Sequence, residues 1–295
     1  YNSTDVTVPA SKTRNTWRGD LNGQNWTNLG NVNVNISMPL TQLSNDGSSN
    51  NQGLILYLDG ANATSGSTIF DQSGNGNDLT YSGSDPYVGS GYYDFNNGGS
   101  AYLPNNPMLN NLLNTISIQM WVYPTGNGVI LDELSIMSTS SGWHESVFEI
   151  TGGNTLNVGF WNGAGITKVT SSITLNTWHL IGVTYDGTTM TAYKDGVSIG
   201  TQVFNRNAPH VEGGGGEVFA PGLADGTNMG SGAYGSFRFG VLQVYNTSLT
   251  SDEMNRCYMS SAYRFGVYPY SAWNGGEPNN AGGEDYIQFV GGGLW

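Results

Sequence analysis

The chain has 295 residues, a formal net charge of −13 at pH 7 and only 11% charged residues. Nucleic acids need Lys and Arg against their phosphates, so this charge excludes them as partners. No apolar run reaches the length of a membrane-spanning helix. The 44 glycines, together with β-branched and aromatic residues between clusters of Asn, Asp and Ser, predict an all-β protein with many turns.

Residues 1–52 form a polar N-terminal arm. In Asn31–Leu40, apolar side chains alternate with polar ones, which predicts a half-buried strand. A strand of this kind suits addition to an exposed sheet edge of another copy of the chain. Because Tyr1 is not an initiator methionine and no signal peptide precedes it, we expect a processed or incomplete chain.

Residues 53–265 are predicted to form a β domain in which short strands alternate with tight turns. The strands with the clearest patterns are Leu54–Leu58, Ile116–Val122, the hairpin Val147–Ile150 with Leu156–Phe160, and the meander Asn176–Gly200 with its Asp-Gly corners. The glycine-rich stretch Glu212–Gly235 has no periodicity and is a candidate binding loop. Thr247–Met259 is the one expected helix, since a serine and two acidic residues near its start suit a helix N-terminus.

The loop Asp71–Asp78 is crowded with oxygen-bearing side chains and glycines. Calcium takes six to eight oxygen ligands, which a flexible loop can supply. Asp71, Asn75 and Asn77 are therefore a candidate Ca²⁺ site. The alternative is a tight turn in which the Asp and Asn side chains cap backbone amides.

Four segments resemble the laminin-G-like, concanavalin-A-like jelly rolls, in the order Leu54–Asp78, Thr115–Thr125, Asn176–Gly200 and Phe239–Asn255. The third segment carries Trp-His, a hydrophobic strand, Tyr-Asp-Gly, another strand and Tyr-x-Asp-Gly. The resemblance covers residues 53–265 and implies an all-β fold, a two-sheet antiparallel jelly-roll sandwich. In relatives of this fold, a loop similar to Asp71–Asp78 often lies beside a structural Ca²⁺, which favours the calcium hypothesis.

Residues 266–295 resemble the calcium-binding half of a C-type lectin domain. Its Glu-Pro-Asn is present at 277–279, its Gly-Glu-Asp at 283–285, and the Trp of its Trp-Asn-Asp triplet is Trp295. The resemblance implies that Glu277, Asn279 and Glu284 bind calcium and hold a sugar's vicinal hydroxyls. The segment departs from the family because Tyr286 replaces the usual disulfide cysteine and the first half of such a domain is absent.

The concanavalin-A-like fold also includes β-glucanases, so a hydrolase has to be weighed. Retaining glycosidases need two carboxylates about 5–5.5 Å apart. The nearest candidates are Glu145 and Glu149, but the central aspartate of the glucanase pattern is missing, and Asp132 and Glu133 lie in another segment. A solvated strand with two acidic residues explains the pair better, so we expect no enzyme. Glycoside hydrolase is the alternative.

Five Asn-x-Ser/Thr sequons predict glycosylation and a location outside the cell or on a cell or virion surface, at Asn2, Asn25, Asn35, Asn62 and Asn246. Cys257 is the only cysteine, so no internal disulfide can form. Trp143, Trp161 and Trp273 are candidate stacking platforms for glycans. The alternative is that they belong to the core, and for Trp161 the two interpretations are equally supported.

We therefore expect a non-enzymatic, extracellular, lectin-like jelly-roll protein that binds glycans with the help of calcium. Its arm or its tail is expected to join copies of the chain into a surface or filamentous assembly, because an unpaired sheet edge and an incomplete lectin-like tail need covering. A soluble monomeric lectin is the alternative.

Overall fold

The structure is a computed structural model that describes residues 15–18, 27–31, 53–82, 85–86, 89–96, 100–103, 115–134, 144–162, 164–206, 218–221 and 235–267. The chain divides into two compact units, Tyr1–Gln42 and Leu43–Trp295. In the first unit, β1 (Asn15–Arg18) pairs antiparallel with β2 (Thr27–Asn31). The predicted strand Asn31–Leu40 lies outside the described residues except for Asn31, which ends β2.

The larger sheet of the second unit has seven strands, ordered β15-β14-β13-β8-β17-β3 with β6 paired to β17. Its strands are β3 (Leu54–Asp59), β6 (Tyr93–Asp94), β8 (Ile116–Pro124), β13 (His179–Tyr185), β14 (Thr189–Lys194), β15 (Val197–Val203) and β17 (Phe237–Tyr245). The neighbours β13, β14 and β15 confirm the predicted meander. At its second corner Asp195 and Gly196 have φ values of 52° and 75°, the left-handed conformations that a two-residue hairpin turn requires.

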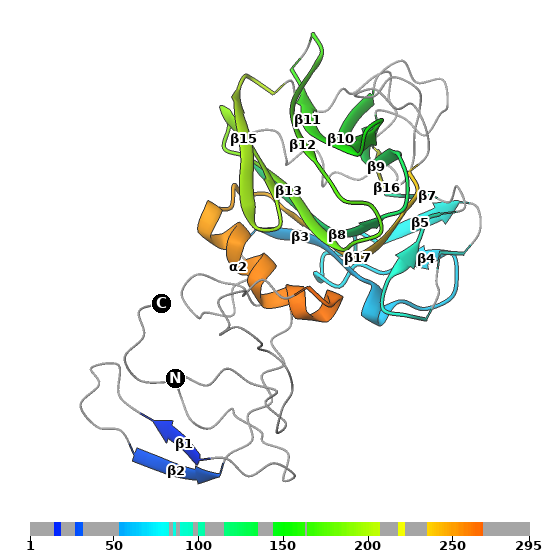
Figure 1. Cartoon of the computed structure of the whole chain (residues 1–295). Coiled ribbons are helices and arrows are strands. Elements are labelled where there is room, and N and C mark those ends of the chain that lie inside the picture. The colour runs from blue at the N-terminus through cyan, green and yellow to red at the C-terminus, as the bar shows by residue number, and fades with distance from the viewer. Residues whose placement is uncertain are drawn as a thin grey trace. The chain divides into compact units, whose positions relative to one another are not determined.

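Two smaller sheets complete the β structure (Figure 1). One has five strands in the order β12-β11-β10-β9-β16, namely β9 (Gly128–Leu134), β10 (His144–Thr151), β11 (Thr155–Trp161), β12 (Ile166–Ser172) and β16 (Val218–Pro221). The other has three, namely β4 (Thr68–Ile69), β5 (Leu79–Ser82) and β7 (Ser100–Tyr102). The pairing of β10 with β11 confirms the predicted hairpin, whereas β16 is a strand inside the stretch that we expected to be a loop.

The hydrophobic core lies between the seven-stranded and five-stranded sheets. Alternate residues of β8 face it, because Ile116, Ile118, Met120 and Val122 all belong to one buried cluster with Phe148 and Phe160 of the five-stranded sheet. Burial of each such side chain contributes about 1.5–3 kcal/mol. The antiparallel two-sheet sandwich that the sequence predicts is confirmed.

The face of the seven-stranded sheet that points away from this core is covered in part by a helix, α2 (Ser251–Ser261), which continues into the 3-10 helix η3 (Ala262–Phe265). Figure 1 shows α2 beside the sheet. Thr250 caps α2, accepting from the Glu253 amide while the Glu253 carboxylate accepts from the Thr250 amide. The expected helix, Thr247–Met259, is confirmed with shifted bounds, since α2 begins at Ser251 and ends at Ser261. A second short 3-10 helix, η2 (Gly60–Asn62), follows β3. None of the described helices is long and apolar enough to cross a membrane.

Candidate functional site

Four side chains form a row across the end of the seven-stranded sheet, on the face opposite the core. Arg238 of β17 stands opposite Tyr123 of β8 on one side and Asp94 of β6 on the other. His179 of β13 pairs with Val122 of β8, and the two strands are antiparallel. Trp178, one residue before His179, therefore lies next to Tyr123, one residue after Val122. The neighbours of these residues in sequence, including Val122 and Phe239, point into the core, so strand alternation directs the row outward. We call Trp178, Tyr123, Arg238 and Asp94 the Trp178 row.

Aromatic rings dominate one end of the Trp178 row. The Trp178 ring meets Tyr123 and Tyr92 edge-to-face, with centroid distances of 5.6 and 5.9 Å. On its other side Trp178 packs on Phe265 of η3, with a centroid distance of 4.7 Å. All four rings are half-buried. They are therefore held by packing while part of each ring remains accessible to solvent.

The other end of the row is polar and charged. Arg238 Nε donates to Asp94 Oδ2 over 2.9 Å, and the guanidinium lies 5.2 Å from the Tyr92 ring centre and 5.3 Å from that of Tyr123. Such cation–π contacts favour a fixed arginine. Burial lowers the pKa of Arg238, but the hydrogen bond to Asp94 outweighs it, so the pKa lies above its usual value and the side chain is cationic.

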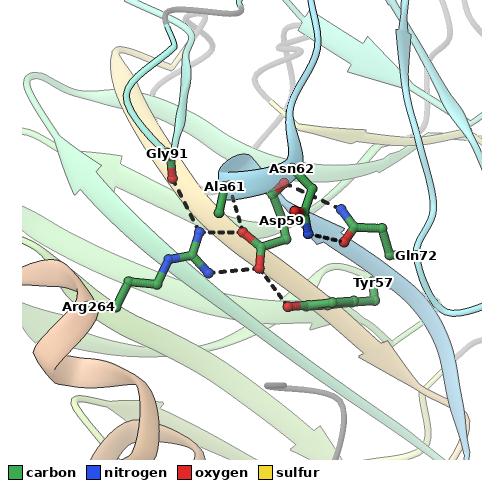
Figure 2. Close-up of polar contacts among 7 residues, drawn as sticks. All are labelled: Tyr57, Asp59, Ala61, Asn62, Gln72, Gly91 and Arg264. Atoms are coloured by element: carbon green, nitrogen blue, oxygen red, sulfur yellow. Dashed lines mark hydrogen bonds and ion pairs between the residues drawn. The ribbon is translucent and has the colours of Figure 1, made fainter. Parts of the chain in front are cut away.

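An ion pair between the buried Asp59 and the partly exposed Arg264, next to Phe265, fixes the surroundings of the row (Figure 2). Asp59, at the end of β3, is 5% exposed and accepts two hydrogen bonds from Arg264 of η3, one of them over 2.8 Å. The Tyr57 hydroxyl and the Ala61 amide donate to the same carboxylate over 2.7 and 2.8 Å. Burial raises the pKa of Asp59, but these hydrogen bonds outweigh it and hold the pKa below its usual value. The carboxylate thereby ties η3 to the sheet.

The same ion pair reaches the segment that carries Tyr92. Arg264 also donates weakly to the carbonyl oxygen of Gly91, over 3.4 Å. A Cβ atom on Gly60 would lie 2.5 Å from the Tyr92 Cα, so only glycine allows this close approach of η2 to the Tyr92 backbone. The position of Tyr92 beside Arg238 therefore depends on Gly60 and Arg264.

The arrangement suits a flat polar ligand with one apolar face. Neighbouring strands are about 4.8 Å apart, so four residues in a row span about 14 Å, comparable to a disaccharide or trisaccharide. The face of an aromatic ring is electronegative and attracts the C–H groups of a sugar's apolar face. In the described part of the chain no hydrogen bond uses the Nη1 and Nη2 groups of Arg238, which leaves donors for hydroxyl oxygens.

The loop that we proposed as a calcium site is closed by hydrogen bonds. The Asp71 carboxylate accepts from the amides of Tyr57, Ser73 and Asn77, each over 2.9 Å, and from the Ser73 hydroxyl over 2.7 Å. Asn75 and Asn77 turn their amide groups toward backbone carbonyls of β3. A cation at Asp71 would have to displace these donors, so the residues as placed fit a capped turn better than a metal site. Among the described residues, no three His, Cys, Asp or Glu gather closely enough to hold a metal ion.

Most of the other predicted site residues lie outside the described part of the chain. This holds for the predicted calcium ligands Glu277, Asn279 and Glu284, for the tryptophans Trp143 and Trp273, and for the sequons at Asn2, Asn25 and Asn35. The glycine-rich stretch is described only at Val218–Pro221 and at Gly235. Of the sequon asparagines, Asn62 and Asn246 are described, and both are exposed.

Strand pairing brings together the acidic residues that we considered for a glycosidase. Glu145 stands opposite Glu133, and Asp132 opposite Ser146, because β9 and β10 are neighbours. In the sequence these residues lie in separate segments. Register shifts between Ser146 and Glu149 interrupt the simple alternation. Glu149 and Asp132 are fully buried, so neither carboxylate is open to solvent.

The sequence alone does not predict the Trp178 row. The signal that bears on it was the polar face of β8, where Ser117, Gln119 and Trp121 alternate with the core residues and Tyr123 continues the series. Trp121 is covered by α2, its Nε1 donating to Ser261 over 2.8 Å. Tyr123 is less buried than Trp121 and lies at the open end of that face. A half-buried aromatic at this end was the available clue.

Comparison with known proteins identifies the fold. A family model described as the concanavalin A-like lectin/glucanases superfamily matches residues 95–255. A search of curated proteins found no match. The binding domain of botulinum neurotoxin DC in complex with SialylT is similar at a TM-score of 0.50 and 15% identity, covering 72% of this chain and 52% of the toxin chain.

Two further solved structures are similar at the same level. The botulinum neurotoxin serotype C1 binding domain has a TM-score of 0.51 and 16% identity over 70% of this chain and 52% of its own. Trypanosoma rangeli sialidase in complex with sialic acid has a TM-score of 0.49 and 15% identity over 71% of this chain and 33% of its own. The chain thus spans about half of the toxin chains and a third of the sialidase. At identities this low, the likeness to the toxin domains shows a shared fold alone.

Proposed function

Because the chain belongs to the concanavalin A-like lectin/glucanase superfamily, we propose that it is a carbohydrate-binding, lectin-like protein that holds sugars on the Trp178 row. The observation that carries the proposal is the combination, in one row, of half-buried rings with a fixed arginine–carboxylate pair. The botulinum neurotoxin domains that share the fold support it, since one is in complex with SialylT and the type C toxin interacts with two ganglioside molecules.

The binding experiment uses a glycan array followed by titration of the best ligand. Replacing Tyr123 or Trp178 with alanine removes a stacking ring and is expected to weaken binding at least about tenfold, since each lost contact of about 1.4 kcal/mol corresponds to that factor. Tyr263→Ala is the matched control, because Tyr263 is 48% exposed and does not belong to the row. Equal losses in the control, or unchanged binding in both row variants, would reject this site.

We propose that binding occurs without turnover. The full burial of Glu149 and Asp132 supports this, because a glycosidase needs two carboxylates that reach the scissile bond. Glycoside hydrolysis is the second candidate, favoured by the pairing of Glu145 with Glu133 on neighbouring strands. Release of reducing ends from a β-glucan by the wild type, abolished by Glu145→Gln or Glu149→Gln, would establish the second candidate.

We also propose an extracellular or surface location for a glycosylated protein. The exposure of Asn62 and Asn246 supports modification at these two sequons. In a eukaryotic secretion host, each site used should add one glycan that glycosidase treatment removes. Asn62→Gln and Asn246→Gln should each lower the mass by one glycan, and an unglycosylated product would contradict the proposal.

We propose that copies of the chain assemble through the arm or the tail. Most of the arm, Tyr1–Gln42, forms a separate compact unit with its own two-stranded sheet, as an assembly module would. Deletion of residues 1–52 should convert an assembled protein into a folded monomer in light scattering. An intact chain that is monomeric at high concentration would support the soluble lectin instead.

Calcium dependence stays a prediction for both candidate sets, Asp71 with Asn75 and Asn77, and Glu277 with Asn279 and Glu284. A cation that binds only the folded chain raises its melting temperature. Excess EDTA should therefore lower the melting temperature if either site binds calcium. Because hydrogen bonds already occupy the Asp71 carboxylate, we expect EDTA to leave the contribution of that loop to the melting temperature unchanged. An unchanged melting curve, with no metal found by elemental analysis, would reject both sites.

A further inference from the structure

We propose that the Trp178 row selects uncharged sugars and disfavours sugars that carry a carboxylate, such as sialic or uronic acids. This inference rests on the proposed function and adds the chemical class of the ligand. The type C toxin noted above interacts with gangliosides, so the shared fold alone does not predict it. The inference depends on the charges that border the row in this chain.

Both arginines near the row are already paired with a carboxylate. Arg238 donates to Asp94 over 2.9 Å, within the row itself. Arg264, next to Phe265, is held by Asp59. Each positive charge therefore has a negative charge in contact with it, and the local charges of the two pairs cancel. A site that recognises a carboxylate normally offers an arginine whose charge is not neutralised in this way.

The pair is still well suited to sugar hydroxyls. Asp94 is acceptor-only, and it also accepts from the Asn96 amide over 2.9 Å, while the terminal NH2 groups of Arg238 are donors. A sugar hydroxyl that donates to Asp94 can have a neighbouring oxygen that accepts from Arg238. Two adjacent hydroxyls would thus bridge the ion pair, beside rings that contact the apolar face of the sugar.

A carboxylate in the same place would lie close to Asp94 as well as to Arg238, so repulsion from Asp94 offsets attraction to Arg238. Like charges at about 4 Å repel strongly near a protein surface, and the whole chain adds a net charge of −13. Solvent and salt screen the distant charges, but a contact of a few ångströms lies inside the screening length of about 8 Å at physiological ionic strength. Asp94 therefore offsets the attraction that Arg238 alone would offer to a carboxylate, and it is the residue that disfavours acidic sugars.

The experiment compares matched sugars on wild type and on Asp94→Asn. The array carries pairs that differ by an acidic residue, among them lactose with 3′-sialyllactose and glucose-terminated with glucuronate-terminated chains. The wild type should bind the neutral member at least about tenfold more tightly. Asp94→Asn keeps an oxygen that can accept from Arg238 but removes the negative charge, so the ratio should fall toward one or reverse. Asp252→Asn, an exposed site at the start of α2, makes the same charge change and should leave the ratio as it is.

The outcomes separate this inference from the function on which it rests. A wild type that prefers the acidic members, or an Asp94→Asn ratio equal to that of the wild type, overturns the inference while glycan binding stands. An Asp252→Asn variant that shifts the ratio as much as Asp94→Asn also overturns it, because total charge would then be the cause. Absence of binding to every member of the array overturns the proposed function and this inference together.

Discussion

Replacing Arg264 with methionine removes the charged hydrogen bonds to Asp59 but keeps an unbranched side chain of similar reach. Asp59, 5% exposed, would keep two donors, the Tyr57 hydroxyl and the Ala61 amide. Loss of one partner of a fully buried ion pair costs about 3–5 kcal/mol. The Arg264 side chain is 28% exposed, so water can partly replace it, and we expect a loss of about 2–3 kcal/mol. At about 2–4 °C per kcal/mol for a domain of this size, the melting temperature should fall by about 4–12 °C.

The assay is chemical denaturation at pH 7 with Arg264→Met, Asp59→Asn and the double variant. Because the two side chains form one interaction, the double variant should lose clearly less than the sum of the single losses, with a coupling of at least about 1 kcal/mol. Arg264→Met should also weaken sugar binding, since Arg264 holds the Gly91 carbonyl beside Tyr92. Additive losses, with a coupling below about 0.5 kcal/mol, would refute the reasoning.

The pKa of Asp59 is lowered in the folded chain. The ionised carboxylate therefore stabilises the fold above the ordinary carboxyl pKa, and this stabilisation is lost as the pH falls through the lowered pKa. The difference in unfolding free energy between wild type and Asp59→Asn should shrink in acid, and a constant difference would contradict this. Burial raises the pKa of the Cys257 thiol to about 11, so a thiol reagent at pH 8 should label the native chain only as fast as it unfolds; rapid native labelling would contradict the burial. Gly60→Ala places a Cβ 2.5 Å from the Tyr92 Cα. The substitution should lower the free energy of unfolding by about 1–3 kcal/mol, measured by chemical denaturation, and weaken sugar binding, measured by titration. Unaltered binding would show that Tyr92 does not contribute to the site.

Much of the fold could be predicted because its signals are local. The alternation in Ile116–Val122 defines β8, the Asp-Gly corners define the β13–β15 meander, and the acidic start after Thr250 defines α2. Each signal lies within about ten residues of sequence. The same reasoning found the turn chemistry of Asp71–Asp78, whose carboxylate caps backbone amides as the alternative hypothesis stated.

The candidate site could not be predicted in this way, because its residues meet only through the strand order. Asp94 and Arg238 are 144 residues apart in sequence, and they touch because β6 pairs with β17. Trp178 reaches Tyr123 through the pairing of β13 with β8. Neither pairing follows from hairpin connections. Trp143 and Trp273, the candidate stacking platforms that the sequence suggests, lie outside the described residues.

The burial of Glu149 is a feature that the local sequence pattern could not predict. Two glutamates four residues apart predict a shared, solvated strand face. The register shifts in β10 break that relation, and Glu149 is fully buried opposite Asn157 of β11. Burial depends on which elements cover a face, and that is set by the whole fold.

The most direct test of the central claim is a crystal structure of the chain with its best uncharged array ligand. We predict that one sugar ring lies against Trp178 and Tyr123, with its hydroxyls within hydrogen-bond distance of Arg238 and Asp94. Sugar bound elsewhere, with the Trp178 row empty, would contradict the claim.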